Sequence, residues 1–167
     1  MRVLSTLLLM LIWLPLLGGC SGEPDSGPVK IRWDRETCAR CAMAVSDPRF
    51  SAQIRGGPVD GKQRVYKFDD IGCAVVWLEQ QPWKNDPRTE VWVTDFRDGH
   101  WIDATTAWYL PGQKTPMDYG LGAQDEPAPG ALDFTAAREH IFRVDEQITR
   151  GGAPAHDHPP TTRSTPE

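Results

Sequence analysis

Two cysteines and a methionine lie within six residues of one another, in the segment Cys38-Ala39-Arg40-Cys41-Ala42-Met43. A fold that contains this segment must bridge the two thiols, bury them or place a metal ion between them. Soft thiolate and thioether ligands select Cu(I) over harder divalent ions, whereas zinc sites rarely use methionine. The segment therefore favours a Cu(I) site. A short disulfide loop with Met43 filling a gap in the core is the structural alternative.

Residues 1–19 have the layout of an export signal. An apolar run from Leu4 to Leu17 follows a positive residue and ends in two glycines directly before Cys20. A membrane span needs ~20 apolar residues, so a cleaved signal is favoured over an anchor. The Leu-Gly-Gly-Cys sequence that ends at Cys20 is typical of a bacterial lipobox. It predicts lipidation of Cys20 and attachment to a membrane facing the periplasm, and Ser21 favours the outer membrane.

The cysteine count and the net charge narrow the function further. If Cys20 carries lipid, Cys38, Cys41 and Cys73 remain. An odd number of thiols in an exported protein means one bridge plus a free thiol, or a metal site, and modestly favours the latter. The formal net charge is −5, and no basic stripe is present. Nucleic acid is therefore excluded as an expected partner, and the predicted membrane contact is the lipid.

Two segments outside the folded part are predicted to be flexible. Residues 20–30 are rich in Gly, Pro and Ser and form the expected tether behind the lipidated cysteine. Residues 151–167 have no large apolar residue to bury, which predicts a disordered tail. His156 and His158 in this tail could bind a metal weakly, although a lone His-x-His in such a segment is usually incidental.

Between these segments the sequence predicts an α+β fold in two lobes, residues 31–97 and residues 98–150. In the first lobe, two strands precede a helix capped by Asp69 or Asp70, and a third strand follows the helix. The second lobe has short strands and then a helix from Asp133 to about Ile148. The expected strands are residues 50–54, 64–68, 91–94, 101–103, 107–110 and 119–123.

Five further motifs occur in a fixed order after the cysteine segment: Tyr66-x-Phe68-Asp69-Asp70-Ile71-Gly72-Cys73, Val93-Thr94-Asp95-Phe96, Trp101-Ile102-Asp103-Ala104, Ala107-Trp108-Tyr109 and Thr115-Pro116-Met117-x-Tyr119-Gly120. Each motif alone is weak, but the ordered set, which spans about residues 36–123, is specific. With the lipobox, these motifs resemble those of the NosL family, lipoproteins that serve the copper supply of nitrous oxide reductase.

The resemblance implies a Cu(I) chaperone built from two similar ββαβ lobes. Members of the family hand copper on during maturation of the copper centres of nitrous oxide reductase, together with a dedicated ABC-type transporter complex. The implied partners are that enzyme, that transporter and a membrane reached through the lipid. One residue departs from the pattern: Ala42 stands where members often have glycine, and alanine lacks the freedom of glycine to adopt positive φ.

Cys41 and Met43 are the first candidate ligands, because an i, i+2 spacing in an extended loop points both side chains the same way. Cys38 is expected as a third ligand, or else as a redox partner of Cys41. Met117 is the candidate from the second lobe, against the alternative that it fills a gap in the core. His100 is either an accessory ligand or a surface histidine, and the surface interpretation is favoured.

Other residues receive structural roles. Cys73 falls within the apolar first helix and is expected to be a buried thiol that acts as a small hydrophobe. Asp69 and Asp70 are expected as a helix cap and a first-turn charge. The sequence has no recognisable nucleophile–base pair and no phosphate-binding loop. The chain is therefore predicted not to be an enzyme.

A thiol–disulfide oxidoreductase that uses Cys38 and Cys41 is the alternative function. Thioredoxin-like proteins place such a pair at the N-terminus of a helix, which lowers the pKa of the first thiol. Here Pro48 follows Cys41 too closely for a helix to propagate. The sequence therefore favours copper binding over redox exchange.

Overall fold

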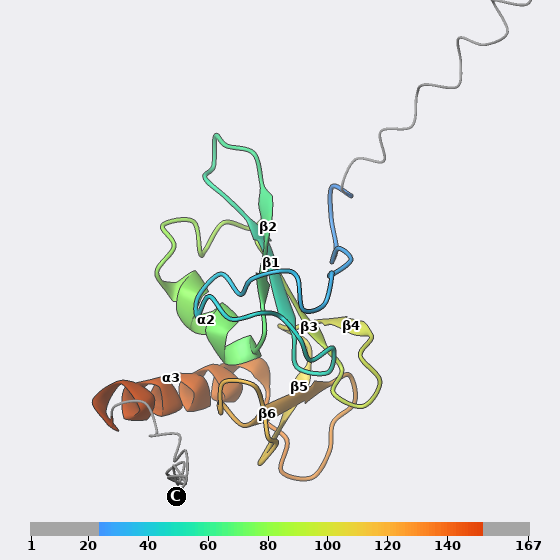
Figure 1. The fold of residues 1–167 in the computed structure, drawn as a ribbon, viewed down its shortest axis with the longest axis vertical. Coiled ribbons are helices and arrows are strands. Elements are labelled where there is room, and N and C mark those ends of the chain that lie inside the picture. Colours follow the sequence, from blue (N-terminus) through green and yellow to red (C-terminus); the bar gives the residue numbers. More distant parts are fainter. Residues whose placement is uncertain (1–23, 152–167) are drawn as a thin grey trace, which may run out of the picture.

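The computed structural model describes residues 24–151, and their fold is of the predicted α+β class (Figure 1). The predicted signal peptide (residues 1–19), the predicted lipidation site Cys20 and the tail after Gly151 lie outside the described residues. None of the described helices is long and apolar enough to span a membrane. In chain order the elements are β1 (Ala52–Gly56), β2 (Arg64–Phe68), α2 (Ile71–Glu79), β3 (Glu90–Thr94), β4 (Trp101–Asp103), β5 (Trp108–Pro111), β6 (Leu121–Gln124) and α3 (Phe134–Gly151).

An antiparallel four-stranded sheet in the order β2-β1-β3-β4 forms the larger layer. Of its two central strands, β1 is buried along its whole length. Successive side chains of a strand point to opposite faces. Ile54 therefore lies in the hydrophobic core with α2, whereas Gln53 and Arg55 face the segment that precedes the sheet.

That preceding segment, residues 24–31, is hydrogen-bonded to the sheet. The side chain of Gln53 accepts the N–H of Val29 at 2.8 Å and donates to its C=O at 2.7 Å. Arg55 donates to the C=O of Gly27 at 2.9 Å. Residues 24–30 belong to the predicted flexible tether, and in the structure side chains of β1 hydrogen-bond the backbone of two of them, Gly27 and Val29, whose groups a free tether would direct to water.

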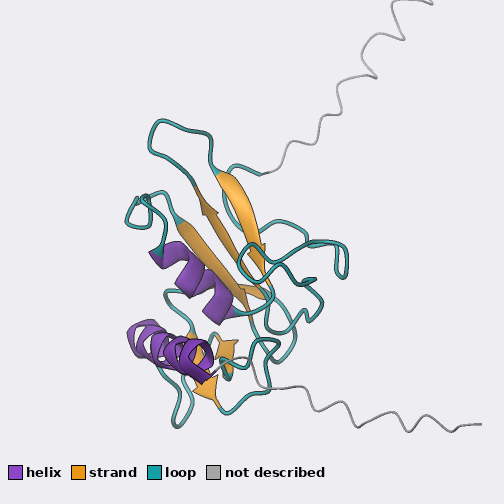
Figure 2. Cartoon of the chain, turned by 60° about the vertical axis from the view of Figure 1, so that its left-hand side comes forward, coloured by secondary structure: helices purple, strands orange, loops and turns teal. Residues whose placement is uncertain are grey.

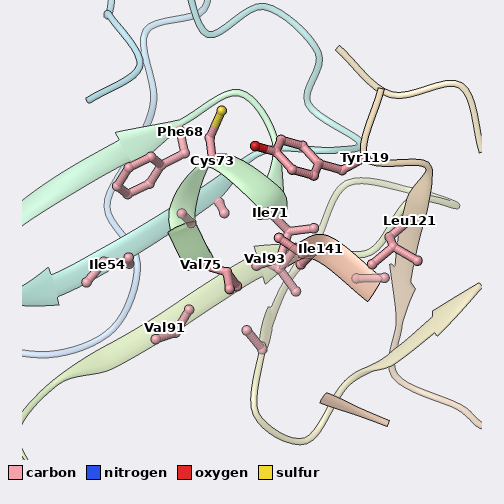
Figure 3. Close-up of a cluster of buried hydrophobic side chains, with 14 of the residues drawn as sticks. Ile54, Phe68, Ile71, Cys73, Val75, Val91, Val93, Tyr119, Leu121 and Ile141 are labelled. Atoms are coloured by element: carbon pink, nitrogen blue, oxygen red, sulfur yellow. The ribbon is translucent and has the colours of Figure 1, made fainter. Parts of the chain in front are cut away.

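Helix α2 lies across the other face of the sheet, as its apolar side predicts (Figure 2). Asp70 is its N-cap and accepts the N–H of Gly72 at 2.9 Å. Figure 3 shows Ile71, Cys73 and Val75 of α2 among buried residues of the sheet. The first turn of α2, which begins at Asp70, is thus held firmly at one edge of the core.

The second unit consists of the two-stranded antiparallel sheet β5-β6 and helix α3, which contacts both β5 and α2. It does not repeat the expected ββαβ pattern, because its described elements are two strands and one helix. The strand predicted at residues 101–103 forms β4 and pairs with β3 in the first sheet. The turn at Asp98-Gly99, where Gly99 has a φ of 83°, returns the chain alongside β3.

Candidate metal centre

The cysteine segment folds into a single tight turn that is attached to the large sheet. The N–H of Cys38 donates to the C=O of Met43 at 2.8 Å and closes the turn. The N–H of Ala39 donates to the C=O of Lys67 in β2 at 2.9 Å and fixes the turn to the sheet edge. Residues three apart on a helical turn share one side, so Cys38 and Cys41 face the same way.

Ala42 ends this turn in the left-handed region, with a φ of 62°, and donates its N–H to the C=O of Cys38 at 3.1 Å. A β-carbon in this conformation destabilises the folded chain by roughly 1–2 kcal/mol. A glycine removes this strain, but it also raises the entropy of the unfolded chain, which costs about 0.4–1 kcal/mol of stability. We therefore expect Ala42→Gly to raise the free energy of unfolding by about 0.5–1 kcal/mol, as measured by urea denaturation of the reduced chain.

The matched control for this prediction is Ala39→Gly, in the same turn but without a positive φ. It is expected to lower the free energy of unfolding by about 0.5–1 kcal/mol, the usual cost of introducing a glycine. If both variants lose stability to the same extent, the left-handed conformation of Ala42 is wrong.

Cys73 joins the two thiols of the turn. It is the third residue of α2, and the ligand atoms of Cys38, Cys41, Cys73 and Asp69 all lie within 4.8 Å of one another. We call these four side chains the thiol cluster. All three cysteines are free thiols. Cys38 and Cys73 are 2% and 0% exposed, whereas Cys41 is half-buried, so the cluster reaches the surface on the side of Cys41.

The thiol cluster carries its first negative charge on Cys38. Hydrogen bonding from Cys73 lowers the pKa of Cys38 to about 4, although burial acts in the opposite direction. Burial raises the pKa of Cys41 to about 12, and hydrogen bonding to Cys38 together with burial raises the pKa of Cys73 still further. Near pH 7 the cluster therefore holds one thiolate and two protonated thiols, and a metal ion that binds all three sulfurs releases two protons.

Asp69 is the acidic member of the cluster and lies beside the protonated thiols. The thiol of Cys41 donates to its two carboxylate oxygens, each at 3.5 Å. Burial, and then hydrogen bonding to Cys38, raise the pKa of Asp69 to about 7. Asp69 thus titrates near neutral pH rather than remaining a permanent charge.

The chemistry of these donors suits a soft metal ion. Three thiolate sulfurs that converge on one point match the preference of Cu(I) for soft ligands. The carboxylate of Asp69 adds a harder fourth donor, and three thiolates with one carboxylate also suit a tetrahedral Zn²⁺ ion. Cu(I) gains little from a hard oxygen ligand, whereas Zn²⁺ accepts one. The two ions therefore differ in whether Asp69 serves as a ligand.

The NosL family model matches residues 28–152, which is most of the sequence. The chain belongs to the NosL family. Among solved structures, this NosL chain is similar to the crystal structure of the copper chaperone NosL from Shewanella denitrificans, with 18% identity and a TM-score of 0.43. The match covers 72% of this chain and 89% of that chain. A comparison with curated proteins gives no match.

The two methionines predicted as ligands occupy different environments in this NosL chain. Met43 is 53% exposed and follows the tight turn, so the i, i+2 argument, which assumed an extended loop, does not apply to it. Met117 is partly buried against the core, and its N–H donates to Asp70 Oδ2 at 3.2 Å. Since Asp70 directly follows Asp69, the loop that carries Met117 borders the thiol cluster.

His100 lies in a different group of potential ligands. Its ring and the carboxylates of Asp95 and Asp125 offer ligand atoms within 4.8 Å of one another. Arg97 already pairs with both carboxylates, and hydrogen bonding to Asp98 raises the pKa of His100. His100 is a surface residue in the structure, and its role as an accessory copper ligand stays a prediction.

Sequence reasoning did not assign Cys73 and Asp69 to the site. Cys73 is buried as expected, but it contacts other thiols rather than acting only as a hydrophobe. Asp70 alone caps α2, which leaves Asp69 free to face the cysteines. Helical spacing gives no signal for this pair, because Asp69 lies outside α2, before the extended backbone of its N-cap Asp70.

Proposed function

We propose that this NosL family member is a Cu(I)-binding metallochaperone. The observation that carries the proposal is the convergence of Cys38, Cys41 and Cys73, whose sulfurs lie within 4.8 Å of one another at the edge of the core. Among residues 24–151, this is the one group of side chains that offers three soft donors. Copper is the cargo of the protein and not a resident cofactor.

A carrier must hold its ion firmly and yet pass it on by ligand exchange. In this proposal the thiolates of Cys38, Cys41 and Cys73 supply the affinity. The neutral thioethers of Met43 and Met117 supply weaker positions that an acceptor displaces. Met43 is exposed beside the half-buried Cys41, so an acceptor first meets the ion on that side. Transfer of this kind makes and breaks no covalent bond within the chain, which fits a binding protein rather than an enzyme.

Competitive titration of the reduced, full-length chain tests this proposal. Under anaerobic conditions we expect the chain to withdraw Cu(I) from a coloured Cu(I) chelator until one ion is bound per chain. Protein whose thiols have been alkylated with iodoacetamide is the control and is expected to withdraw none. If the unmodified chain leaves the chelator fully loaded, the proposed function is wrong.

The cellular setting is a further part of the proposal. Lipidation of Cys20 attaches the chain to a membrane that faces the periplasm. Ser21, which follows the cysteine, favours the outer membrane. From there it delivers Cu(I), directly or through an ABC-type transporter complex, to nitrous oxide reductase. The lipobox and the family membership support this setting. A strain without the chain is expected to make copper-poor nitrous oxide reductase, and a fully loaded enzyme in that strain would rule out this acceptor.

One observation favours the alternative, a thiol–disulfide oxidoreductase. The pKa of Cys38, about 4, is in the range of nucleophilic thiols. However, Cys38 is only 2% exposed, which denies it to a substrate disulfide, and the more accessible Cys41 has a pKa of about 12. We expect no turnover in an insulin-reduction assay. Turnover that disappears in Cys38→Ser would establish the redox function instead.

A further inference from the structure

Arg40, which lies between the two cysteines of the turn, is joined to a distant part of the chain. Its Nη1 donates to the hydroxyl of Tyr119 at 2.7 Å, and its Nη2 donates to Asp145 Oδ1 at 2.6 Å. The hydroxyl of Tyr119 donates to the same Asp145 oxygen at 2.7 Å. We call these three side chains the triad. They connect the cysteine turn, the loop before β6 and helix α3, and each pair is mutually hydrogen-bonded.

The triad is shielded from solvent. The side chains of Arg40 and Asp145 are 25% and 20% exposed, and Tyr119 is 1% exposed. Charge-assisted hydrogen bonds are among the stronger ones, and shielding from water strengthens them further. The triad is therefore a firm connection rather than a surface ion pair, which typically contributes little.

Tyr119 also contacts the helix that carries Cys73. A Cβ atom on Gly72 would fall 2.1 Å from the ring of Tyr119, so the ring lies directly on the first turn of α2. Figure 3 shows Cys73 and Tyr119 next to each other, with the tyrosine hydroxyl directed toward the side of Cys73. Burial lowers the pKa of Arg40. Its interactions with Tyr119 and Asp145 and its hydrogen bond to Cys73 outweigh this effect, so that the pKa of Arg40 is raised overall. The triad thus borders the thiol cluster on the side of α2.

The same loop carries Met117, two residues before Tyr119. Asp70 accepts the N–H of Met117 at 3.2 Å, and His140 of α3 lies with its Nε2 3.0 Å from the C=O of Tyr119. The loop is thereby held in place at Met117 and at Tyr119. The bonds of Arg40 to Tyr119 and Asp145 oppose a movement of the cysteine turn away from α2.

We propose that Arg40, Tyr119 and Asp145 form a latch that holds the cysteine turn against Cys73 and thereby sets the rate at which bound Cu(I) leaves. Arg40 couples the cysteine turn to the other two residues, because its backbone lies between Cys38 and Cys41 and moves with both. Three thiolates around one Cu(I) ion carry a net negative charge, which the guanidinium of Arg40 partly offsets. The three residues are positioning residues, since none of them binds the ion in this proposal, which rests on the proposed function.

The latch predicts a separation between copper release and copper ligation. Tyr119→Phe removes the hydroxyl and keeps the ring that packs on Gly72, and Asp145→Asn removes the charge that Arg40 contacts. We expect each variant of the full-length chain to transfer Cu(I) to an excess of chelator about tenfold faster than wild type, as followed by stopped-flow absorbance. The thiolate-to-copper charge-transfer absorption of the loaded protein is expected to stay unchanged.

Two matched controls separate the latch from a general loss of stability. Tyr109→Phe removes another buried tyrosine hydroxyl, which donates to the C=O of Ala104 at 2.7 Å. Glu146→Gln removes a carboxylate next to Asp145 that pairs only with Arg150 among the described residues. Both controls are expected to transfer Cu(I) at the wild-type rate.

The outcomes distinguish the latch from the proposed function. If wild type retains Cu(I) and Tyr119→Phe and Asp145→Asn release it at the wild-type rate, the latch is wrong and the carrier function stands. Faster release in all four variants, or an altered charge-transfer band in the two latch variants, would also overturn it. If wild type binds no Cu(I), the proposed function fails before the latch is tested.

Discussion

Replacing Cys73 with serine is expected to lower the affinity for Cu(I) about 100-fold, equivalent to about 2.8 kcal/mol. Serine preserves the size of the side chain in the first turn of α2, but it offers a hard hydroxyl in place of a soft thiolate. The cluster then holds Cu(I) through Cys38 and Cys41 alone. Competition with a Cu(I) chelator under anaerobic conditions measures the change.

Ala74→Ser is the matched control for this prediction. It places the same hydroxyl at the next residue of α2, which is equally buried, and leaves all three thiols in place. We expect it to reduce stability but to bind Cu(I) as wild type does. Wild-type affinity in Cys73→Ser would instead return Cys73 to the role of a small buried hydrophobe and leave Cys38 and Cys41 as the thiol ligands.

Raising the pH is expected to strengthen Cu(I) binding by about 100-fold per pH unit between about pH 8 and pH 10, above the range in which Asp69 titrates. In this range Cys38 is ionised, since its pKa is about 4. Cys41 and Cys73 are protonated, since the pKa of Cys41 is about 12 and that of Cys73 is raised further. Each proton that the ion displaces contributes a factor of about ten per pH unit, and a higher pH removes these protons more easily.

Titrations at several pH values, against a chelator whose own affinity is constant over the range, give this slope. In Cys73→Ser only one proton is left to displace, so the slope is expected to fall to about tenfold per pH unit. Equal slopes in wild type and Cys73→Ser would show that Cys73 does not ionise when copper binds, which contradicts the three-thiolate site.

Local patterns predicted most of the secondary structure. The helix after Asp70 was predicted from one cap and one apolar side, and α2 confirms it. The strands predicted at 64–68 and 101–103 coincide with β2 and β4. The partner of β4 could not be predicted in this way, because strand pairing depends on contacts between residues far apart, and the hairpin at Gly99 joined β4 to the first sheet rather than to a second lobe.

The site was predicted only where its residues are close in sequence. Cys38 and Cys41 stand out because they lie three residues apart, and their sulfurs lie close together in the structure. The apolar neighbours of Cys73 along α2 predict a core residue, and only the packing of the cysteine turn on the helix end brings it to the other thiols. The contacts of Arg40 with Tyr119 and Asp145 span 79 and 105 residues, so no local pattern indicated them.

X-ray absorption at the copper edge of the Cu(I)-loaded, full-length chain tests the central claim most directly, because it identifies the atoms bound to the ion. The thiol cluster predicts a first shell made of sulfur alone, reduced by one sulfur in Cys73→Ser. A first shell dominated by nitrogen or oxygen, or a chain that loses its copper on desalting, would contradict the claim that these thiols hold the cargo.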